Sequence, residues 1–183
     1  MTPLDPQAPI LDRAADTLLA LAAERPWRDI SLRAVAEAAA VPLAELFDLA
    51  DGKGALLAHL SARFDRAALA TAATDSDDVH DRLFDAVMAR VEAMEPHRAA
   101  LTAIARDAGA LALVPHFPRT ARAILEAAGV EATPPRLAAT TAVWARAAQV
   151  WRDDQGALNR TMAEIDKRLK QMRARLGRIG AGF

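Results

Sequence analysis

The chain of 183 residues contains no cysteine and no tyrosine, and aromatic residues make up only 4% of it. Without cysteine, disulfide bridges, thiolate metal sites and cysteine nucleophiles are excluded. The shortage of aromatic residues, beside an apolar fraction of 52% led by alanine, disfavours a β-rich fold. Small and straight-chain side chains suit helices that pack on helices. The composition therefore predicts an all-α protein.

Signals for export, membrane insertion and phosphate binding are also missing. The opening residues, MTPLDPQAP, lack the basic start and apolar run of a secretory signal, and no stretch approaches the roughly 20 apolar residues of a membrane span. We find no Gly-rich phosphate loop and no internal repeat. We therefore expect a cytoplasmic protein of one domain, or of a small module joined to a larger one.

Catalytic and metal-binding patterns are absent as well. The four histidines lie far apart in the sequence, at His59, His80, His97 and His116, and lack a spaced carboxylate pattern. No Ser-His-Asp or paired-carboxylate arrangement is recognisable. We expect a protein that is not an enzyme and that has no metal and no cofactor.

Charge is unevenly distributed, although the net charge is only −1. Residues 1–66 carry seven basic and ten acidic side chains, whereas residues 156–183 carry seven basic and two acidic ones. This asymmetry places any attraction for an anionic partner at the end of the sequence rather than at its start.

Apolar spacing, capping residues and Pro or Gly breaks predict about nine helices. Ser31, Asp77 or Asp78, and Thr133 are expected N-caps, and residues 109–118 are expected to be irregular. The expected helices cover residues 9–24, 32–39, 43–50, 56–69, 79–91, 101–108, 120–128, 134–151 and 158–179.

Residues 30–57 have the layout of a helix-turn-helix followed by a supporting helix. The turn falls at Val41-Pro42, and residues 43–50 form the recognition helix, with Leu43, Leu46 and Phe47 expected to face inward. The charged residues of that helix and its end are acidic, namely Glu45, Asp48 and Asp51, with Lys53 opposing them. Because DNA binding normally draws on Lys and Arg, this helix is unusual for its place.

The block resembles the TetR family of transcription regulators. The matching residues are Ile10-Leu11-Asp12-Arg13-Ala14-Ala15, the cap Ser31, Ala34-Val35-Ala36-Glu37-Ala38-Ala39, the turn Ala40-Val41-Pro42, and Leu46, Phe47, Ala50, Lys53 and Leu56-Leu57. Two departures are clear. Phe47 stands where the family usually has a phosphate-binding tyrosine, and Ala44, Glu45, Asp48 and Leu49 stand where polar or basic groups usually read bases.

The resemblance implies a head of three helices over residues 1–54 and a helical body over residues 55–183 that binds a small apolar ligand and forms a homodimer. Operator DNA would be the partner of the head. The implied DNA-binding residues are Arg28, Ser31, Arg33, Leu43, Ala44, Glu45, Phe47, Asp48 and Lys53. The expected lining of the ligand pocket, apolar and between helices, is Phe84, Val87, Met88, Ile104, Leu113, Phe117, Trp144 and Trp151. Ordinary core packing explains the same eight residues.

A second resemblance covers about 30 residues near the end, from Ala142-Val143-Trp144 through Trp151, Asp153-Asp154 and Thr161 to Asp166-Lys167-Arg168. It is to the lipid-binding proteins of ubiquinone biosynthesis, which share the TetR fold. This similarity implies an alternative function: a lipid- or quinone-binding accessory protein that does not bind DNA and works at the inner membrane.

The last helix carries apolar residues at alternating separations of four and three, from Leu158 to Phe183. Basic side chains occupy its other faces. Such a helix can pack on the body or a partner subunit, or lie on an anionic membrane. The residues expected at that membrane or partner are Leu169, Met172, Arg173, Arg175, Leu176, Arg178 and Ile179. A transcription regulator, a lipid-binding accessory protein and an interaction module acting through this helix all remain open.

Overall fold

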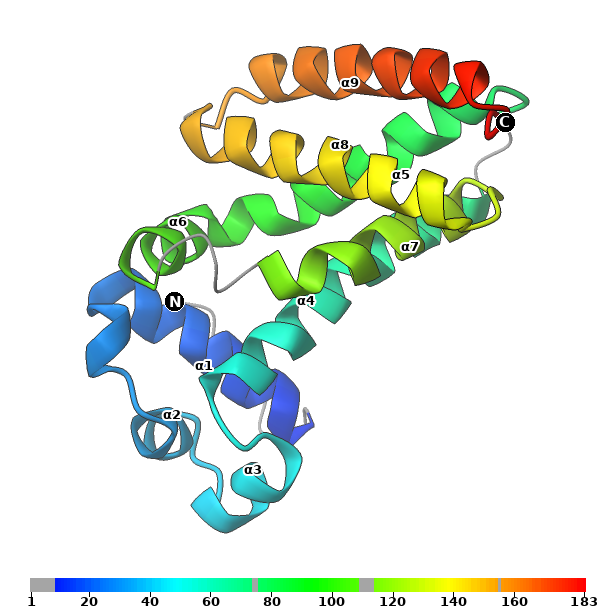
Figure 1. Ribbon diagram of the computed structural model, residues 1–183. Coiled ribbons are helices and arrows are strands. Elements are labelled where there is room, and N and C mark those ends of the chain that lie inside the picture. Colours follow the sequence, from blue (N-terminus) through cyan, green and yellow to red (C-terminus); the bar gives the residue numbers. More distant parts are fainter. Residues whose placement is uncertain (1–8, 74–75, 109–113, 155) are drawn as a thin grey trace. The chain divides into compact units, whose positions relative to one another are not determined.

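The computed structural model describes residues 9–73, 76–108, 114–154 and 156–183, and these residues form helices and no strand. Short 3-10 turns precede α6 and α7 and join α1 to α2. The α-helices, shown in Figure 1, are α1 Ile10–Glu24, α2 Leu32–Ala38, α3 Leu43–Leu49, α4 Lys53–Ala70, α5 Val79–Met94, α6 Arg98–Asp107, α7 Phe117–Ala127, α8 Pro134–Asp153 and α9 Asn159–Arg178. The all-α expectation is therefore confirmed for the described residues.

The chain divides into two compact units, and the division differs from the expected boundary after residue 54. Met1–Ala62 and His97–Val114 form the first unit, whereas Arg63–Pro96 and Pro115–Phe183 form the second. Helix α6 therefore belongs to the first unit, although it lies far beyond the expected head in the sequence. It does so because it packs on α1 and on the 3-10 turn Trp27–Asp29.

Helix α1 is the centre of the first unit. It contacts α2, α3 and α6, and it buries Ala14, Ala15 and Leu18 completely. The small alanines let neighbouring helices approach closely, while leucine supplies apolar area. Outside this core, Asp12 Oδ1 lies 2.7 Å from His59 Nε2, which joins α1 to the first part of α4.

The second unit is built around α8, which packs on α7 and on α9. Figure 1 shows α8 and α9 running side by side in opposite directions. Helix α9 buries Ile165, Leu169, Met172 and Leu176 within the chain, where it contacts α8 and α5. The apolar stripe expected on this helix is therefore mainly a packing surface of its own unit.

Capping follows the sequence at two helices and departs from it at a third. Ser31 Oγ accepts a hydrogen bond from Ala34 N at 3.1 Å, and Asp78 Oδ1 accepts one from His80 N at 2.9 Å. Both expected caps are confirmed, with Asp78 rather than Asp77 at the start of α5. Thr133 is the N-cap residue of α8, as expected, but its side chain makes no cap hydrogen bond. Pro134 has no N–H, and its fixed backbone suits the first turn without a side-chain cap.

Asp154, the residue that follows α8, bonds to the first turn of α9. Asp154 Oδ2 accepts hydrogen bonds of 2.8 Å from both the backbone N–H and the hydroxyl of Thr161. Both residues are buried. The acidic break and threonine that carried the second resemblance thus have a structural role, because they satisfy donors in the first turn of α9.

Three further expectations need correction. Helix α6 begins at Arg98 rather than near residue 101, and α7 begins at Phe117 with Pro118 in its first turn, inside the segment expected to be irregular. Residues 109–113 of that segment lie outside the described residues. Phe47, expected to face inward, is exposed. Leu46 supplies the buried face of α3 instead, since a helix of only two turns buries one narrow stripe.

Candidate functional site

The turn between α2 and α3 has the geometry of a helix-turn-helix. Ala40 adopts a left-handed backbone with φ of 51°, which reverses the chain after α2. The N–H of Val41 donates to Ala36 O at 3.0 Å, and its side chain is buried. Pro42 then starts α3. A left-handed alanine is strained by about 1 kcal/mol, because its Cβ crowds the backbone.

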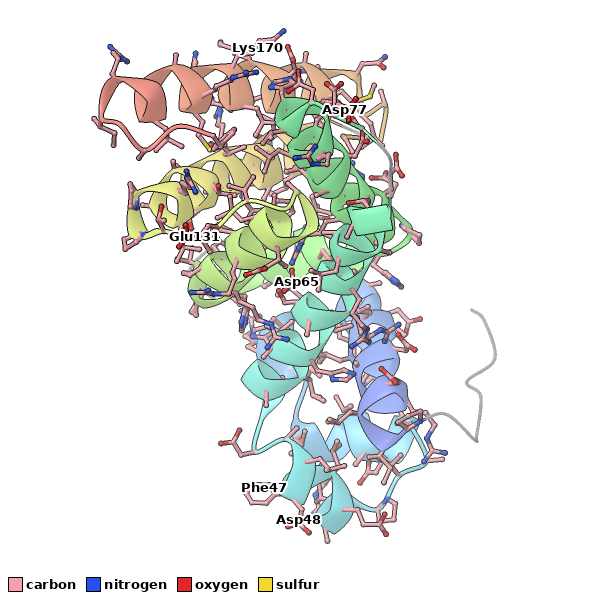
Figure 2. The ribbon with its side chains drawn as sticks, turned by 90° about the vertical axis from the view of Figure 1, so that its right-hand side faces the viewer. Phe47, Asp48, Asp65, Asp77, Glu131 and Lys170 are labelled. Atoms are coloured by element: carbon pink, nitrogen blue, oxygen red, sulfur yellow. The ribbon has the colours of Figure 1, made fainter. Side chains whose placement is uncertain are left out.

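Helix α3 presents apolar and acidic side chains to solvent. Leu46 is fully buried against the unit, whereas Phe47 is 57% and Leu49 is 54% exposed. Ala44, Glu45 and Asp48 are exposed too, and Figure 2 shows Phe47 and Asp48 projecting from α3. The exposed surface of the recognition helix therefore carries no cation between Leu43 and Leu49.

An open groove of about 570 Å³ lies between α2 and α3. Its lining residues are Leu32, Arg33, Leu43, Ala44, Phe47, Asp48 and Asp51. The structure therefore brings together five of the expected DNA-binding residues, namely Arg33, Leu43, Ala44, Phe47 and Asp48. The lining is mostly apolar, with two carboxylates, Asp48 and Asp51, and one cation, Arg33.

The cations expected to contact phosphate lie beside carboxylates or backbone acceptors. Arg28 Nε is 3.7 Å from Asp29 Oδ1, and Arg33 Nη1 is 4.0 Å from Glu37 Oε1, both in exposed surroundings. Neighbouring carboxylates reduce the attraction that these arginines exert on phosphate.

Lys53 and Ser31, the other polar members of the expected set, have roles inside the head. Lys53 Nζ donates to Trp27 O at 2.5 Å and lies 4.3 Å from the centroid of the Trp27 ring. Burial lowers the pKa of Lys53, while Asp29 acts in the opposite direction. Ser31 caps α2. Both residues thus hold the head together, and neither offers a free cation at the groove.

A buried polar cluster in the second unit was not expected from the sequence. Arg90 on α5 is 4% exposed, and its Nε donates to Asp65 Oδ1 at 2.9 Å. Thr120 Oγ1 on α7 donates to the same oxygen at 2.9 Å. Asp65, which lies on α4, is labelled in Figure 2. Burial lowers the pKa of Arg90, while the charge of Asp65 and the hydrogen bond to it counteract this effect.

Trp144 lies against this cluster. Its ring centroid is 4.3 Å from the guanidinium carbon of Arg90 and 6.3 Å from the ring centroid of Phe117, which meets it edge to face. Within the described residues, neither the buried Nε1 of Trp144 nor the buried Oδ2 of Asp65 has a hydrogen-bond partner. The cluster therefore contains two buried polar atoms, a donor and an acceptor, that make no hydrogen bond in an apolar setting.

Two more ionisable residues lie near Asp65. Arg119 Nε is 3.6 Å from Asp65 Oδ2, although the Arg119 side chain is largely exposed. Burial lowers the pKa of His116, partly offset by the charge of Asp65 and reinforced by those of Arg90 and Arg119. His116 is therefore more readily neutral than an exposed histidine.

Sequence reasoning missed Arg90 and Asp65, although the signal was present. Arg90 stands between Val87 and Met94 at helical spacing, where an apolar residue would continue the buried stripe of α5. Asp65 stands in the same way four residues after the buried Ser61 and three before the buried Ala68. A charge in a buried stripe indicates a paired interior group, because an unpaired one would be strongly destabilising.

The expected pocket residues do not all fall in one unit. Phe84, Val87, Met88, Phe117, Trp144 and Trp151 belong to the second unit, whereas Ile104 is buried in the first and Leu113 lies outside the described residues. Trp151 Nε1 donates to Glu95 Oε2 at 2.8 Å. Of the two tryptophans, Trp144 is therefore the one beside the charged cluster.

Three of the four apolar residues expected at a membrane or partner surface are instead buried within the chain. Leu169, Met172 and Leu176 are at most 4% exposed, and Ile179 alone among the apolar residues of that set is largely exposed. The basic members Arg173, Arg175 and Arg178 are exposed. An amphipathic helix binds lipid through its apolar face, which α9 uses inside the bundle.

The end of α9 is also held by the chain itself. Gly180 adopts φ of 69°, and the N–H of Ala181 donates to Leu176 O at 2.9 Å, which closes the helix. Arg136 on α8 donates to Ala181 O at 3.0 Å and to Gly182 O at 2.6 Å. The glycines near this end therefore need no membrane or partner to become ordered.

Neither a metal site nor a membrane span is evident in the part of the chain that the structure describes. No three His, Asp or Glu side chains gather closely enough to hold a metal ion. No described helix combines the length and the hydropathy that crossing a membrane requires.

Solved structures resemble this chain along most of its length. A TetR transcriptional regulator from Nitrosomonas europaea ATCC 19718 superposes with a TM-score of 0.69 at 21% identity, over 90% of this chain and 98% of that one. A TetR transcriptional regulator from Rhodococcus sp. RHA1 gives 0.67 at 16% identity, over 88% and 93%. The fatty acid degradation regulator FadR from Bacillus halodurans gives 0.55 at 13% identity, over 92% and 96%. No protein-family model and no curated protein matches the chain.

The chain has the TetR fold. In the TetR fold, α2 and α3 occupy the helix-turn-helix that the sequence predicted, and the buried cluster around Arg90 lies in the helical body. At these identities the similarity concerns the fold, so the ligands of the head and of the body have to be argued from the residues themselves.

Proposed function

We propose that this protein is a TetR-type transcription regulator. It binds DNA through α2 and α3 and a small, mostly apolar effector in its body, and it is not an enzyme. One observation carries the proposal: a helix-turn-helix whose second helix is exposed, within a fold matched by solved regulators along about nine-tenths of the chain. Exposure of Ala44, Glu45, Phe47, Asp48 and Leu49 leaves α3 available for a major groove. A DNA target also implies that the protein works in the cytoplasm.

The effector site that we propose is centred on Trp144. Apolar ligand sites in helical proteins carry a few polar groups that orient the ligand. Trp144 Nε1 and Asp65 Oδ2, which make no hydrogen bond in the described residues, supply two such groups, and the aromatic ring of Phe117 lies beside Trp144. Val87 and Met88 contribute apolar surface on α5. A ligand with both a hydrogen-bond donor and an acceptor, on an otherwise apolar frame, fits these groups.

The active form is a homodimer in this proposal. Dimeric helix-turn-helix proteins place two recognition helices in successive major grooves, about 34 Å apart along the duplex. Two weak heads gain affinity when they are joined, because the second head binds at high effective concentration. This gain matters here, since each head supplies little positive charge of its own.

The lipid-binding alternative receives no support. The burial of Leu169, Met172 and Leu176 removes the stripe that the membrane contact required. Asp154 and Thr161, which carried the second resemblance, are explained by capping. The names of the similar solved structures are those of regulators. The third hypothesis, an interaction module acting through the apolar stripe of α9, has no support either, because the same residues are buried.

Band-shift experiments with the purified full-length protein test the proposal. Duplex DNA from upstream of its own gene is expected to be retarded at 50 mM salt and released as salt rises. Arg33→Glu in the groove is expected to weaken binding at least about tenfold, because it replaces a cation with an anion near phosphate. Arg122→Glu, the same change on exposed α7, is the matched control and should leave binding unchanged. No retardation at 50 mM salt refutes the proposal.

The dimer and the effector site have separate tests. Sedimentation equilibrium is expected to give twice the mass of 19.6 kDa. Solvent extraction of the purified protein is expected to yield a small apolar compound that mass spectrometry detects. The Trp144→Ala variant should yield none of this compound. Trp27→Ala, in the other unit, serves as the control. A monomer contradicts the dimer, and retention by Trp144→Ala contradicts the effector site.

A further inference from the structure

We infer that the recognition helix reads cytosine and thymine in its operator, through Glu45 and Asp48 for the first and through Ala44 and Phe47 for the second. This inference rests on the proposed function, since it names the bases that the head would prefer. It follows from which side chains α3 leaves exposed and from what each type can bind in a major groove.

The first step concerns geometry. In a docked helix-turn-helix, residues near the start of the second helix contact base edges, while the first helix crosses the backbone. On α3 these residues are Ala44 and Glu45 in the first turn and Phe47 and Asp48 in the second, and all four are exposed. Leu46 points into the unit and is fully buried, so it is excluded.

The second step concerns chemistry. Guanine presents acceptors in the major groove and is read by Arg or Lys, and adenine is read by Asn or Gln. None of these four residue types occurs in α3. Carboxylates accept a hydrogen bond from the cytosine amino group, and Ala or Phe side chains contact the thymine methyl. The exposed face of α3 is thus limited to these two kinds of contact.

The neighbouring cations do not change this assignment. Arg33 lines the groove from α2, the helix that crosses the backbone, and its Nη1 lies 4.0 Å from Glu37 Oε1. Lys53 is held by Trp27, and Arg28 lies beside Asp29 outside both helices. These cations are placed for phosphate or for the head itself, so base selection is left to α3.

Selection from a random duplex library with the full-length protein tests the inference. The enriched half-site is expected to contain a C·G pair next to a T·A pair. Replacing guanine by 7-deazaguanine there removes the N7 acceptor that a cation would use, and it should leave affinity unchanged within about twofold. Replacing thymine by uracil removes the methyl group and should weaken binding several-fold.

Two variants identify the reading side chains. Glu45→Gln or Asp48→Asn is expected to move the preference at one position from cytosine to adenine by about tenfold, because amides read adenine. Glu37→Gln is the matched control on α2, since it removes the same charge from the head and should leave the preferred bases unchanged.

The outcomes separate the inference from the proposed function. Two outcomes overturn the inference while DNA binding stands. In one, 7-deazaguanine in the enriched site lowers affinity about tenfold. In the other, both α3 variants prefer the same bases as the unchanged protein. If no sequence is enriched at 50 mM salt, the proposed function fails and the inference fails with it. An enriched site that tolerates 7-deazaguanine and shifts with an α3 variant supports both.

Discussion

The guanidinium carbon of Arg90 lies 4.3 Å from the centroid of the Trp144 ring, and the same guanidinium donates to Asp65 from a position that is 4% exposed. A cation on an aromatic face is stabilised by the ring quadrupole, most strongly where water is excluded. The ring therefore helps to hold a charge that would be costly in the interior without partners. In its described residues, the body therefore combines an apolar bundle with a buried, neutralised ion pair.

Removing one partner of this pair is expected to be far worse than removing both. Arg90→Met or Asp65→Leu alone should each lower the free energy of unfolding by about 3 to 5 kcal/mol, because the other charge stays buried without its partner. The double variant should lose much less than the sum of the two. Urea denaturation of the four proteins measures this coupling. Additive losses would show that the pair contributes nothing as a pair.

Ala40 is expected to be a site where glycine stabilises the protein. Its φ of 51° strains any residue with a Cβ, so Ala40→Gly should raise the free energy of unfolding by about 1 kcal/mol. Ala39→Gly is the control one residue earlier, where the right-handed backbone gives glycine no advantage and the change should be destabilising. A loss of stability in Ala40→Gly would contradict the strain.

Phe47 and Leu46 are neighbours with opposite expected effects on stability. Phe47→Ser should change the free energy of unfolding by less than about 0.5 kcal/mol, because the ring is mostly exposed. Leu46→Ala should cost about 2 to 5 kcal/mol, because it opens a cavity in the core of the head. Thermal unfolding followed by circular dichroism distinguishes them. Equal losses would mean that Phe47 is packed in solution.

The cap between Asp154 and Thr161 is expected to stabilise the start of α9. Asp154→Ala should lower the free energy of unfolding by about 1 to 2 kcal/mol, since two donors in the first turn lose their acceptor. Asp153→Ala, an exposed carboxylate next to it, is the control and should change it by less than about 0.5 kcal/mol. Both can be measured in urea. Equal effects would assign the loss to charge rather than to capping.

Glu164 is expected to make stability depend on pH in the acid range. Its carboxylate accepts hydrogen bonds from Arg168 Nε at 2.7 Å and from Arg146 Nε at 3.0 Å, and these bonds lower its pKa. A lowered pKa gives stability that is fully present above the ordinary glutamate value of about 4.3 and is lost as pH falls through the folded value. The stability difference between the protein and Glu164→Gln should therefore shrink below that pH.

The two arginines provide the control for this titration. In the double variant Arg146→Gln/Arg168→Gln, the hydrogen bonds that lower the pKa are gone, so adding Glu164→Gln should cause no comparable change with pH. Unfolding by urea at a series of pH values from neutral to acid measures both comparisons. A difference that grows as pH falls would reverse the assigned direction of the shift.

Much of the fold was predictable from local chemistry. The helix ends at Ser31 and Asp78 follow from side chains that bond the first free N–H groups of the same helix, an interaction within a few residues. The break at Pro26 and the turn before Pro42 follow from proline geometry in the same way. The acidic residues of α3, Glu45 and Asp48, are evident from the sequence, and both are exposed in the structure.

The predictions that were wrong concern packing between residues that are far apart in the chain. Phe47 has the spacing of a core residue in the sequence. In the structure, Leu46 is the buried residue of α3, and the Phe47 ring stays exposed. Helix α6 joined the first unit because it packs on α1, which no pattern in its own sequence indicates.

By itself, the sequence determined the helices, most of their ends, the helix-turn-helix and the acidic character of its second helix, because these depend on backbone geometry and on neighbours three or four residues away. Only the tertiary structure decided three further features. The apolar stripe of α9 packs inside the bundle, Arg136 binds the backbone just after α9, and Arg90 contacts both Asp65 and Trp144. Those outcomes depend on burial against helices that are far apart in the chain, and burial is set by the packing of the whole unit.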